Sequence, residues 1–177
     1  MTGGIAEGKS TVMSYLREWG HETASADEMA REVFNSDGIQ SRLATMLGVV
    51  GAVSPTMLRD RLANDALLRR RVNRIMHPEI AKRLLRASAP WVEVPLLFET
   101  ALHPMFDRVW VVTCGPDTQL ARLTERLGNV EVALALIGTQ LPTPVKCAFA
   151  DEVVWTTKPE GNVKEFLQAA ISREFAK

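Results

Sequence analysis

The sequence has little cysteine, no excess of either charge and no long hydrophobic run. Of its 177 residues only Cys114 and Cys147 are cysteines, and neither belongs to a C-x-x-C pair. The three histidines complete no zinc-binding spacing, so nothing indicates a structural zinc site. We therefore expect two reduced, buried thiols in a cytoplasmic protein.

The charge balance and hydrophobicity exclude further classes of protein. Lys+Arg and Asp+Glu both number 21, so there is no basic excess of the kind that nucleic-acid binding requires. A membrane span needs about 18 consecutive apolar residues, and neither such a run nor the apolar segment of a signal peptide is present. We expect one cytoplasmic domain, a monomer or weak homo-oligomer, with no nucleic-acid or membrane partner.

Hydrophobic periodicity predicts helices that alternate with short strands. Helices are expected at residues 10–19, 27–34, 39–47, 56–76, 79–87, 117–126, 129–140 and 162–175, with a bend at Pro78. Valine-rich runs at residues 91–98, 108–113 and 152–156 predict strands. This alternation indicates an α/β fold with a parallel sheet covered on both faces. The arginines between Arg59 and Arg74 form either a solvated helix face or an anion-binding surface.

The clearest motif is a phosphate-binding loop, or P-loop. Residues 3–10 read G-G-I-A-E-G-K-S, which fits G-x-x-x-x-G-K-[ST] and precedes a predicted helix. Glycines let backbone N–H groups turn toward phosphate oxygens, and the N-terminus of the helix adds further donors. Lys9 can reach the β- and γ-phosphates, and the Ser10 hydroxyl can bind Mg²⁺. A glycine-rich turn without a ligand is the alternative.

This loop departs from the usual pattern in three ways. Ala6 and Glu7 stand where a glycine and a small polar residue would favour close approach of the phosphates. Glu7 also brings a negative charge near the polyphosphate unless its side chain points to solvent. Only Met1 and Thr2 precede Gly3, although a P-loop follows a strand. We therefore expect the central first strand to be missing, through a late recorded start or a truncated domain.

Several further motifs make the chain similar to the dephospho-CoA kinase family. Residues 2–11 resemble its T-G-G-I-G-S-G-K-S-T loop, and residues 26–33 resemble its D-A-D-x-I-A-R segment. The H-P pair at 77–78 and P-L-L-F-E at 95–99 match two other elements, and residues 119–126 and 140–151 fit Q-x-x-R-x-x-x-R and Q-x-P-x-x-x-K-x-x-x-A-D. The order and spacing of these motifs carry the resemblance over nearly the whole chain.

The resemblance implies both an activity and a build. The activity is phosphorylation of the ribose 3′-hydroxyl of dephospho-CoA by ATP with Mg²⁺, the last step of coenzyme A synthesis. The fold is that of a P-loop kinase, a parallel sheet flanked by helices in a single domain over residues 1–177. A helical CoA-binding insert is expected at about 36–88 and a lid over ATP at about 117–146.

Asp27 and Lys9 are the predicted catalytic residues. Asp27 would accept or orient the proton of the ribose hydroxyl, and Lys9 would stabilise charge on the transferring phosphoryl group. Alternatively, Asp27 is only the N-cap of the helix that begins at Glu28. Ser25 replaces the first aspartate of the family segment, which removes one carboxylate from the vicinity of the metal.

The nucleotide is expected to contact the P-loop and the lid. The predicted contacts are Gly4, Ala6, Glu7, Gly8, Lys9, Ser10, Thr11, Arg122 and Arg126. Arg122 and Arg126 are four residues apart and share a helix face, which would close over the phosphates or lie in solvent. Leu136 stands near a position where the family carries another lid arginine. The apolar segment 131–137 either packs on the core or marks a degraded lid.

Metal and substrate contacts complete the predicted site. Ser10 and Glu93 are the metal candidates, Glu93 being alternatively a surface residue of its strand. Besides Asp27, the resemblance suggests as substrate contacts Arg31, His77, Pro95, Leu96 and Glu99. Glu99 would end its strand at the carboxyl edge of the sheet, where open α/β folds bind ligands. For His77 next to Pro78, packing or capping is the favoured alternative.

Two other functions remain open from the sequence. One is a P-loop kinase of nucleosides or nucleotides, against which the P-L-L-F-E and H-P elements argue. The other is a degenerate homologue that binds nucleotide without catalysis, suggested by Ala6, Glu7, Ser25 and Leu136.

Overall fold

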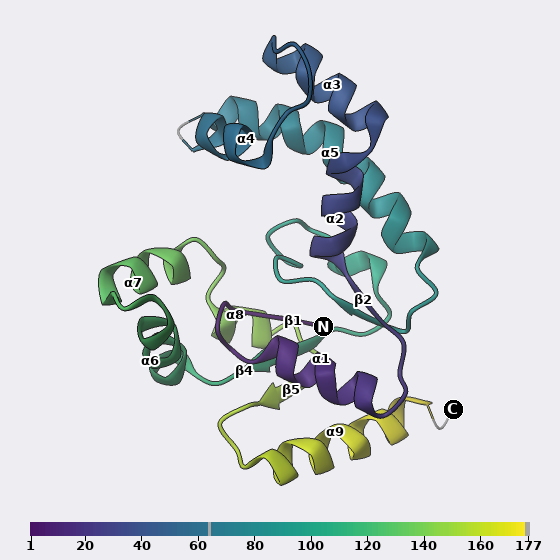
Figure 1. Ribbon diagram of the computed structural model, residues 1–177. Coiled ribbons are helices and arrows are strands. Elements are labelled where there is room, and N and C mark those ends of the chain that lie inside the picture. The colour runs from purple at the N-terminus through teal and green to yellow at the C-terminus, as the bar shows by residue number, and fades with distance from the viewer. Residues whose placement is uncertain (64, 176–177) are drawn as a thin grey trace. The chain divides into compact units, whose positions relative to one another are not determined.

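The computed structural model describes residues 1–63 and 65–175 and has the predicted α/β architecture (Figure 1). The chain divides into two compact units. Unit 1 combines Met1–Ala24 with Ala89–Lys177, and unit 2 is Ser25–Ser88. Unit 2 therefore begins before the expected insert at 36–88 and includes the helix that carries Asp27.

Unit 1 is built around parallel strands. The three strands β1 (Thr2–Gly3), β4 (Trp110–Thr113) and β5 (Glu152–Trp155) form one sheet in the order β1-β4-β5. A second pair joins β2 (Thr23–Ser25) to β3 (Trp91–Glu93). The backbone of Met1 links the two sheets, because its carbonyl accepts a hydrogen bond of 2.8 Å from the N–H of Val94.

A short first strand therefore precedes the P-loop, and the expectation that this strand is missing is wrong. Thr2 is fully buried opposite Val111, and Gly3 lies opposite Val112. A Cβ atom on Gly3, whose φ is +151°, would lie 2.3 Å from the carbonyl oxygen of Val112. Only glycine allows β1 to approach β4 this closely, so even two residues seat the loop firmly against the sheet.

The core of unit 1 forms where helices cover β4. All four residues of β4 are buried, as expected for a central strand rich in β-branched residues. The helices α1 (Lys9–Glu18) and α9 (Glu160–Phe175) contribute Val12, Leu16 and Leu167, each fully buried in the same cluster. Apolar residues at the helical spacing thus fix α1, and with it the P-loop, to the sheet.

Strand β3 is shorter than predicted. It ends at Glu93, and residues 95–101 form consecutive turns instead of the expected extension to residue 98. Pro95 has no N–H to donate to a neighbouring strand, and the turns are closed by hydrogen bonds from Thr100 to Leu96 and from Leu102 to Leu97. An apolar composition alone could not reveal this change of direction.

Three helices connect β4 to β5. They are α6 (Pro116–Leu127), α7 (Val130–Gly138) and the short α8 (Thr143–Cys147). In α7 only Ala133 is buried, whereas the exposed apolar side chains are Val130, Val132, Leu134 and Leu136. The interpretation that this apolar segment packs on the core is therefore wrong. Figure 1 shows α6 and α7 lying against one another as a helical pair.

Unit 2 is a helical unit with its own core. Its helices are α2 (Ala26–Asn35), α3 (Asp37–Leu47), α4 (Pro55–Leu62) and α5 (Ala66–Arg86). The buried side chains that hold them together are Val33, Ile39, Leu43, Val53, Val72 and Met76. The arginine-rich face is exposed, and Arg61 and Arg69 donate hydrogen bonds to the carbonyls of Leu47 and Leu62. These two arginines therefore bind the C-terminal ends of α3 and α4.

Helix α5 continues through Pro78 to Arg86, so the predicted separate helix at 79–87 is wrong. Proline removes one backbone hydrogen bond, to the carbonyl four residues earlier, at Arg74. Both Arg74 and Pro78 are exposed, so that carbonyl can be hydrated. The buried residues Val72, Met76 and Leu84 lie on both sides of the proline and keep the helix in one piece.

Both cysteines are free, but only Cys114 is buried. The prediction of two buried thiols is therefore wrong for Cys147, which is partly exposed. Burial raises the pKa of the Cys114 thiol, which keeps it protonated and unreactive at neutral pH. Across residues 1–63 and 65–175, no helix is both long and apolar enough to span a membrane.

Candidate active site

The P-loop has the local geometry of a phosphate cradle. Gly8 adopts the left-handed conformation (φ +92°) and directly precedes α1, and its carbonyl accepts the N–H groups of Thr11 and Val12. A Cβ atom on Gly8 would lie 3.0 Å from the side chain of Thr156. Among the described residues, the N–H groups of Ala6 and Gly8 find no acceptor. Donors of this kind at the start of a helix suit an anionic ligand.

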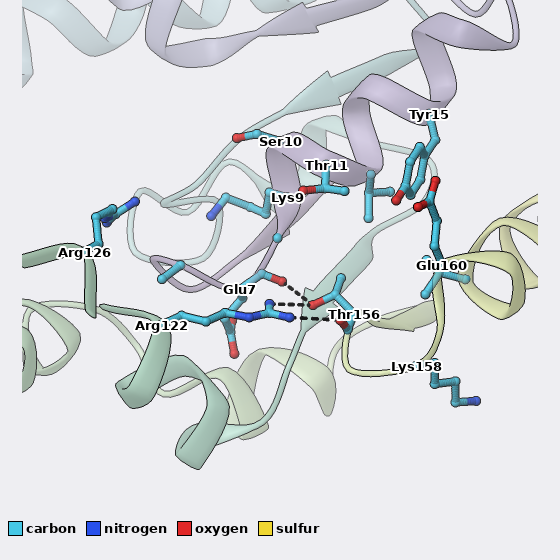
Figure 2. Close-up of a pocket in the computed structure, with 14 residues that line it drawn as sticks. Glu7, Lys9, Ser10, Thr11, Tyr15, Arg122, Arg126, Thr156, Lys158 and Glu160 are labelled. Atoms are coloured by element: carbon cyan, nitrogen blue, oxygen red, sulfur yellow. Dashed lines mark hydrogen bonds between the residues drawn. The ribbon is translucent and has the colours of Figure 1, made fainter. Parts of the chain in front are cut away.

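A cavity of about 470 Å³ opens over this cradle, and all its walls belong to unit 1 (Figure 2). Its lining residues are Ala6, Glu7, Gly8, Lys9, Ser10, Thr11, Val12, Tyr15, Arg122, Arg126, Thr156, Lys158, Glu160 and Val163. The structure thus brings together every predicted nucleotide contact except Gly4, whose carbonyl instead accepts a hydrogen bond of 2.8 Å from Nζ of Lys9.

Arg122 closes one wall of the cavity by binding the segment after β5. Its guanidinium donates to Oγ1 of Thr156 at 3.1 Å and to the carbonyl of Thr156 at 3.0 Å (Figure 2). The Thr156 hydroxyl lies 2.9 Å from the carbonyl of Glu7, to which it donates. Arg122 therefore reaches the P-loop through one threonine, and the interpretation of Arg122 as a solvated surface arginine is wrong. Arg126, one turn later, lines the same cavity.

Glu7 does not point to solvent, and its carboxylate does not face the cradle. The side chain is 1% exposed and is turned into unit 1. Its oxygens accept hydrogen bonds from Thr113 at 2.9 Å, from Thr143 at 2.6 Å and from the N–H of Gly4. These donors hold the carboxylate within unit 1 and away from solvent.

The metal candidates differ in position. Ser10 lies in the first turn of α1 and lines the cavity, whereas Glu93 ends β3, is partly buried and is not a lining residue. Within the described ranges, no group of three or more His, Cys, Asp or Glu residues could hold a metal ion.

The P-L-L-F-E segment lies beside the residues that follow α7. Glu99 is paired with the fully buried Lys146 at 2.8 Å and accepts the N–H of Leu141 at 2.9 Å. Burial acts to raise the pKa of Glu99, but the hydrogen bonds from Lys146 and from backbone N–H groups outweigh it, so the pKa is lowered. The carbonyl of Pro95 accepts from Thr2 and Lys146, and Leu96 is exposed.

Three predicted site residues belong to unit 2. Asp27 is exposed in the first turn of α2, and Arg31 is exposed one turn later on the same face. The N-cap of α2 is Ser25, whose Oγ accepts the N–H of Glu28 at 3.4 Å. The interpretation of Asp27 as the cap is therefore wrong, and its carboxylate carries no capping role. His77 is partly buried within α5.

Sequence reasoning missed the role of three threonines in this site. Thr156 binds Arg122 and the P-loop, and Thr113 and Thr143 bind Glu7. The available signal was position, because Thr113 and Thr156 end or follow parallel strands at the carboxyl edge, where ligands bind in α/β folds. Thr143 gave no comparable signal.

Comparison with known proteins agrees with this geometry. A family model described as dephospho-CoA kinase matches residues 1–159. The curated dephospho-CoA kinase of Gloeobacter violaceus is 35% identical over 166 residues, covering 87% of this chain and 81% of the relative. A crystal structure of a Thermus thermophilus protein superposes with a TM-score of 0.83 at 27% identity, covering 98% of this chain and 95% of the other. The dephospho-CoA kinase structure from Campylobacter jejuni shares the fold, with a TM-score of 0.63 at 20% identity over 97% of this chain and 94% of the other.

Proposed function

The chain belongs to the dephospho-CoA kinase family, which phosphorylates the 3′-hydroxyl of dephospho-CoA in coenzyme A synthesis, and from this premise we propose which of its residues carry out the transfer. The observation that supports the assignment most directly is the cavity where the P-loop, α6 and the segment after β5 meet. It offers backbone donors, Lys9 and two arginines to one anionic ligand, ATP.

Lys9 and the P-loop hold the phosphate end of ATP. Lys9 exchanges the carbonyl of Gly4 for a phosphate oxygen and stabilises charge on the transferring group. Arg122 and Arg126 neutralise the remaining phosphate charge from the lid helix α6. Ser10 would provide the protein's hydroxyl ligand to Mg²⁺ and Glu93 would act through a water, and the ion would supply neutralisation of phosphate charge.

Unit 2 and the P-L-L-F-E segment provide the acceptor side. Asp27 orients the 3′-hydroxyl and takes its proton, which suits an exposed carboxylate free of a capping role. Arg31 and His77, with Pro95, Leu96 and Glu99, contact the CoA moiety. The helical unit thus serves as the CoA-binding insert and the residues at about 117–146 as the lid. We place the enzyme in the cytoplasm as a monomer or weak homo-oligomer.

The assignment of Asp27 is tested by the variant Asp27→Asn. We expect turnover with Mg-ATP and dephospho-CoA, followed as ADP formation, to fall by about 100-fold or more, because the amide cannot accept the proton. The matched control is Asp37→Asn, since Asp37 is likewise exposed in the first turn of a helix, α3. Its activity should remain within about twofold of wild type.

Two outcomes would contradict the proposal. Equal turnover in Asp27→Asn and wild type would remove Asp27 from the catalytic role. Binding of ATP without any phosphoryl transfer by the wild-type protein would instead indicate the degenerate homologue suggested by Ala6, Glu7 and Ser25. The remaining alternative is a kinase of nucleosides or nucleotides. Faster turnover of such acceptors than of dephospho-CoA in the same assay would support it.

A further inference from the structure

A glutamate is buried inside the P-loop of this chain, at a position where the similar family loop carries serine. Glu7 immediately precedes Gly8 and Lys9 and is a lining residue of the cavity, yet it is almost fully buried. A buried carboxylate is costly unless hydrogen bonds replace its lost hydration. Here both oxygens are used, Oε1 by Thr113 and Oε2 by Thr143 and the N–H of Gly4.

The donors come from three separate parts of unit 1. Gly4 belongs to the P-loop itself, Thr113 ends β4, and Thr143 begins α8. A single carboxylate therefore fixes the curvature of the loop and ties it to both the sheet and the residues that follow α7. Oε2 accepts hydrogen bonds from both Gly4 and Thr143. A displacement of α8 would therefore also displace the P-loop backbone at Gly4.

The neighbouring residue Ile5 repeats this connection through its backbone. Its N–H donates to Oε1 of Gln140 at 2.9 Å, and its carbonyl accepts from Nε2 of Gln119 at 3.0 Å. Gln119 lies in the first turn of α6, and Gln140 follows the end of α7. Both ends of the α6–α7 pair are thus hydrogen-bonded to the P-loop next to Glu7.

We propose that Glu7 is a positioning residue that couples the P-loop to the base of the α6–α7 lid and so holds the loop in the geometry needed for transfer. The inference rests on the proposed function, since it concerns the same phosphate site. Glu7 touches no reacting atom; it acts through the N–H donors on either side of it and through Lys9. Because these groups stabilise charge that develops during transfer, misplacing them should lower kcat more than it raises KM.

Two substitutions test the coupling in different ways. Glu7→Ala removes all three hydrogen bonds, and Thr143→Val removes only the link to α8 while keeping the side-chain shape. We expect kcat to fall by about 10- to 100-fold in Glu7→Ala and by about 5-fold in Thr143→Val, with KM for dephospho-CoA within about twofold of wild type. Glu7→Gln keeps an acceptor at the same distance and should recover most of the lost kcat.

The control is Ser172→Ala, which removes an exposed hydroxyl in α9, outside both the cavity lining and the proposed lid. This hydroxyl bonds only to the carbonyl of Gln168, so kcat should be unchanged. Thermal unfolding of each variant is measured in parallel, and assays are made well below the lowest midpoint. If Glu7→Ala does not fold, the comparison of Thr143→Val with Ser172→Ala decides the question.

The proposal is overturned if Thr143→Val and Glu7→Ala lose thermal stability but keep the wild-type kcat, because Glu7 would then only support folding. A double variant Glu7→Ala/Thr143→Val whose losses in kcat simply multiply would also contradict it, since coupled residues are not additive. An inactive wild-type enzyme would reject the proposed function, whereas an active wild type with equally active variants would reject only the role of Glu7.

Discussion

Ala6 is held at a φ of +62°, in the left-handed region where a Cβ atom causes strain. The similar family loop has glycine here, which reaches this conformation at no steric cost. The P-loop of this chain therefore keeps the backbone course of a glycine-rich loop although one of its glycines is replaced. The backbone conformation at position 6 is dictated by the neighbouring contacts rather than by the residue.

Replacing this alanine should consequently stabilise the protein. Ala6→Gly relieves about 1–2 kcal/mol of left-handed strain and costs about 0.5–1 kcal/mol of chain entropy, so a net gain of up to about 1.5 kcal/mol in the free energy of unfolding is expected. Urea denaturation measures it. The control Ala135→Gly, at an exposed position inside α7, should lower stability by a similar amount. Equal destabilisation of both variants would show that Ala6 is not strained.

Residue identity predicted which side chains matter more reliably than where they point. Lys9, Arg122 and Arg126 line one cavity, as their spacing and the resemblance suggested. Glu7 was expected to face either the polyphosphate or solvent, yet it is buried. Its direction depends on Thr113 and Thr143, which are more than 100 residues away along the chain and enter no local pattern.

At the scale of elements, α8 is fixed by a buried ion pair. Lys146 is fully buried, and its partner Glu99 is also bound by the N–H of Leu141. The pair joins α8 to the turns that follow β3, and these two segments lie on either side of β4 in the sequence. Removing one partner of such a pair leaves a buried charge or an unfilled acceptor.

The variant Lys146→Met should therefore lower the free energy of unfolding by about 3 kcal/mol. The control is Lys164→Met, because Lys164 forms a surface pair with Glu160 and lies over the ring of Tyr15, and such exposed contacts contribute much less than a buried pair. Chemical denaturation of both variants at neutral pH measures the difference. Similar losses in the two variants would mean that the Lys146 pair contributes little despite its burial.

The same pair predicts an acid dependence. The folded-state pKa of Glu99 lies below its ordinary value of 4.5, so the ionised carboxylate stabilises the fold. This stabilisation is complete above about pH 4.5 and is lost as the pH falls through the lower folded-state pKa. In Glu99→Gln this part of the acid dependence should be absent. Carboxyl groups titrate at about pH 3 to 5. If Glu99→Gln and the wild type lost stability equally over that range, the prediction would be wrong.

Element types followed from the sequence, but the ends and joints of elements did not. The helices α1, α2, α3, α6, α7 and α9 lie close to their expected ranges. The segment 91–98 was read as one strand because it is apolar, whereas the backbone turns after Pro95. Pro78 predicted the end of one helix and the start of another, yet burial of Val72, Met76 and Leu84 outweighs one lost hydrogen bond and α5 continues to Arg86. Both errors arise because tertiary packing overrides a local rule.

At the scale of the whole molecule, each unit has a separate hydrophobic core. In unit 1 the core lies between α1, β4 and α9, and in unit 2 it lies among α2, α3 and α5. The ATP cavity is lined by unit 1 alone. A ligand stabilises the part of a protein that must be folded to bind it. ATP should therefore stabilise unit 1 against unfolding more than it stabilises unit 2.

Hydrogen exchange can measure this inequality. With ATP at about 100 times its dissociation constant, amides of β4 and α9 that exchange only on unfolding of unit 1 should gain about 2.7 kcal/mol of protection. Amides of α3 should gain less. The control is the same experiment with Lys9→Met, which should show little gain in either unit. Equal gains in α3 and β4 would show that the two units unfold as one.

The distribution of aromatic residues over these two cores has an optical consequence. All four tryptophans and the single tyrosine lie in unit 1, where Trp91 and Trp110 meet edge to face with ring centroids 4.8 Å apart. Unit 2 has neither residue, so its unfolding gives no direct change in tryptophan or tyrosine fluorescence. The intrinsic fluorescence of the wild-type protein therefore reports on unit 1, which holds the nucleotide cavity. A single tryptophan introduced between residues 25 and 88 would give unit 2 a fluorescence signal of its own.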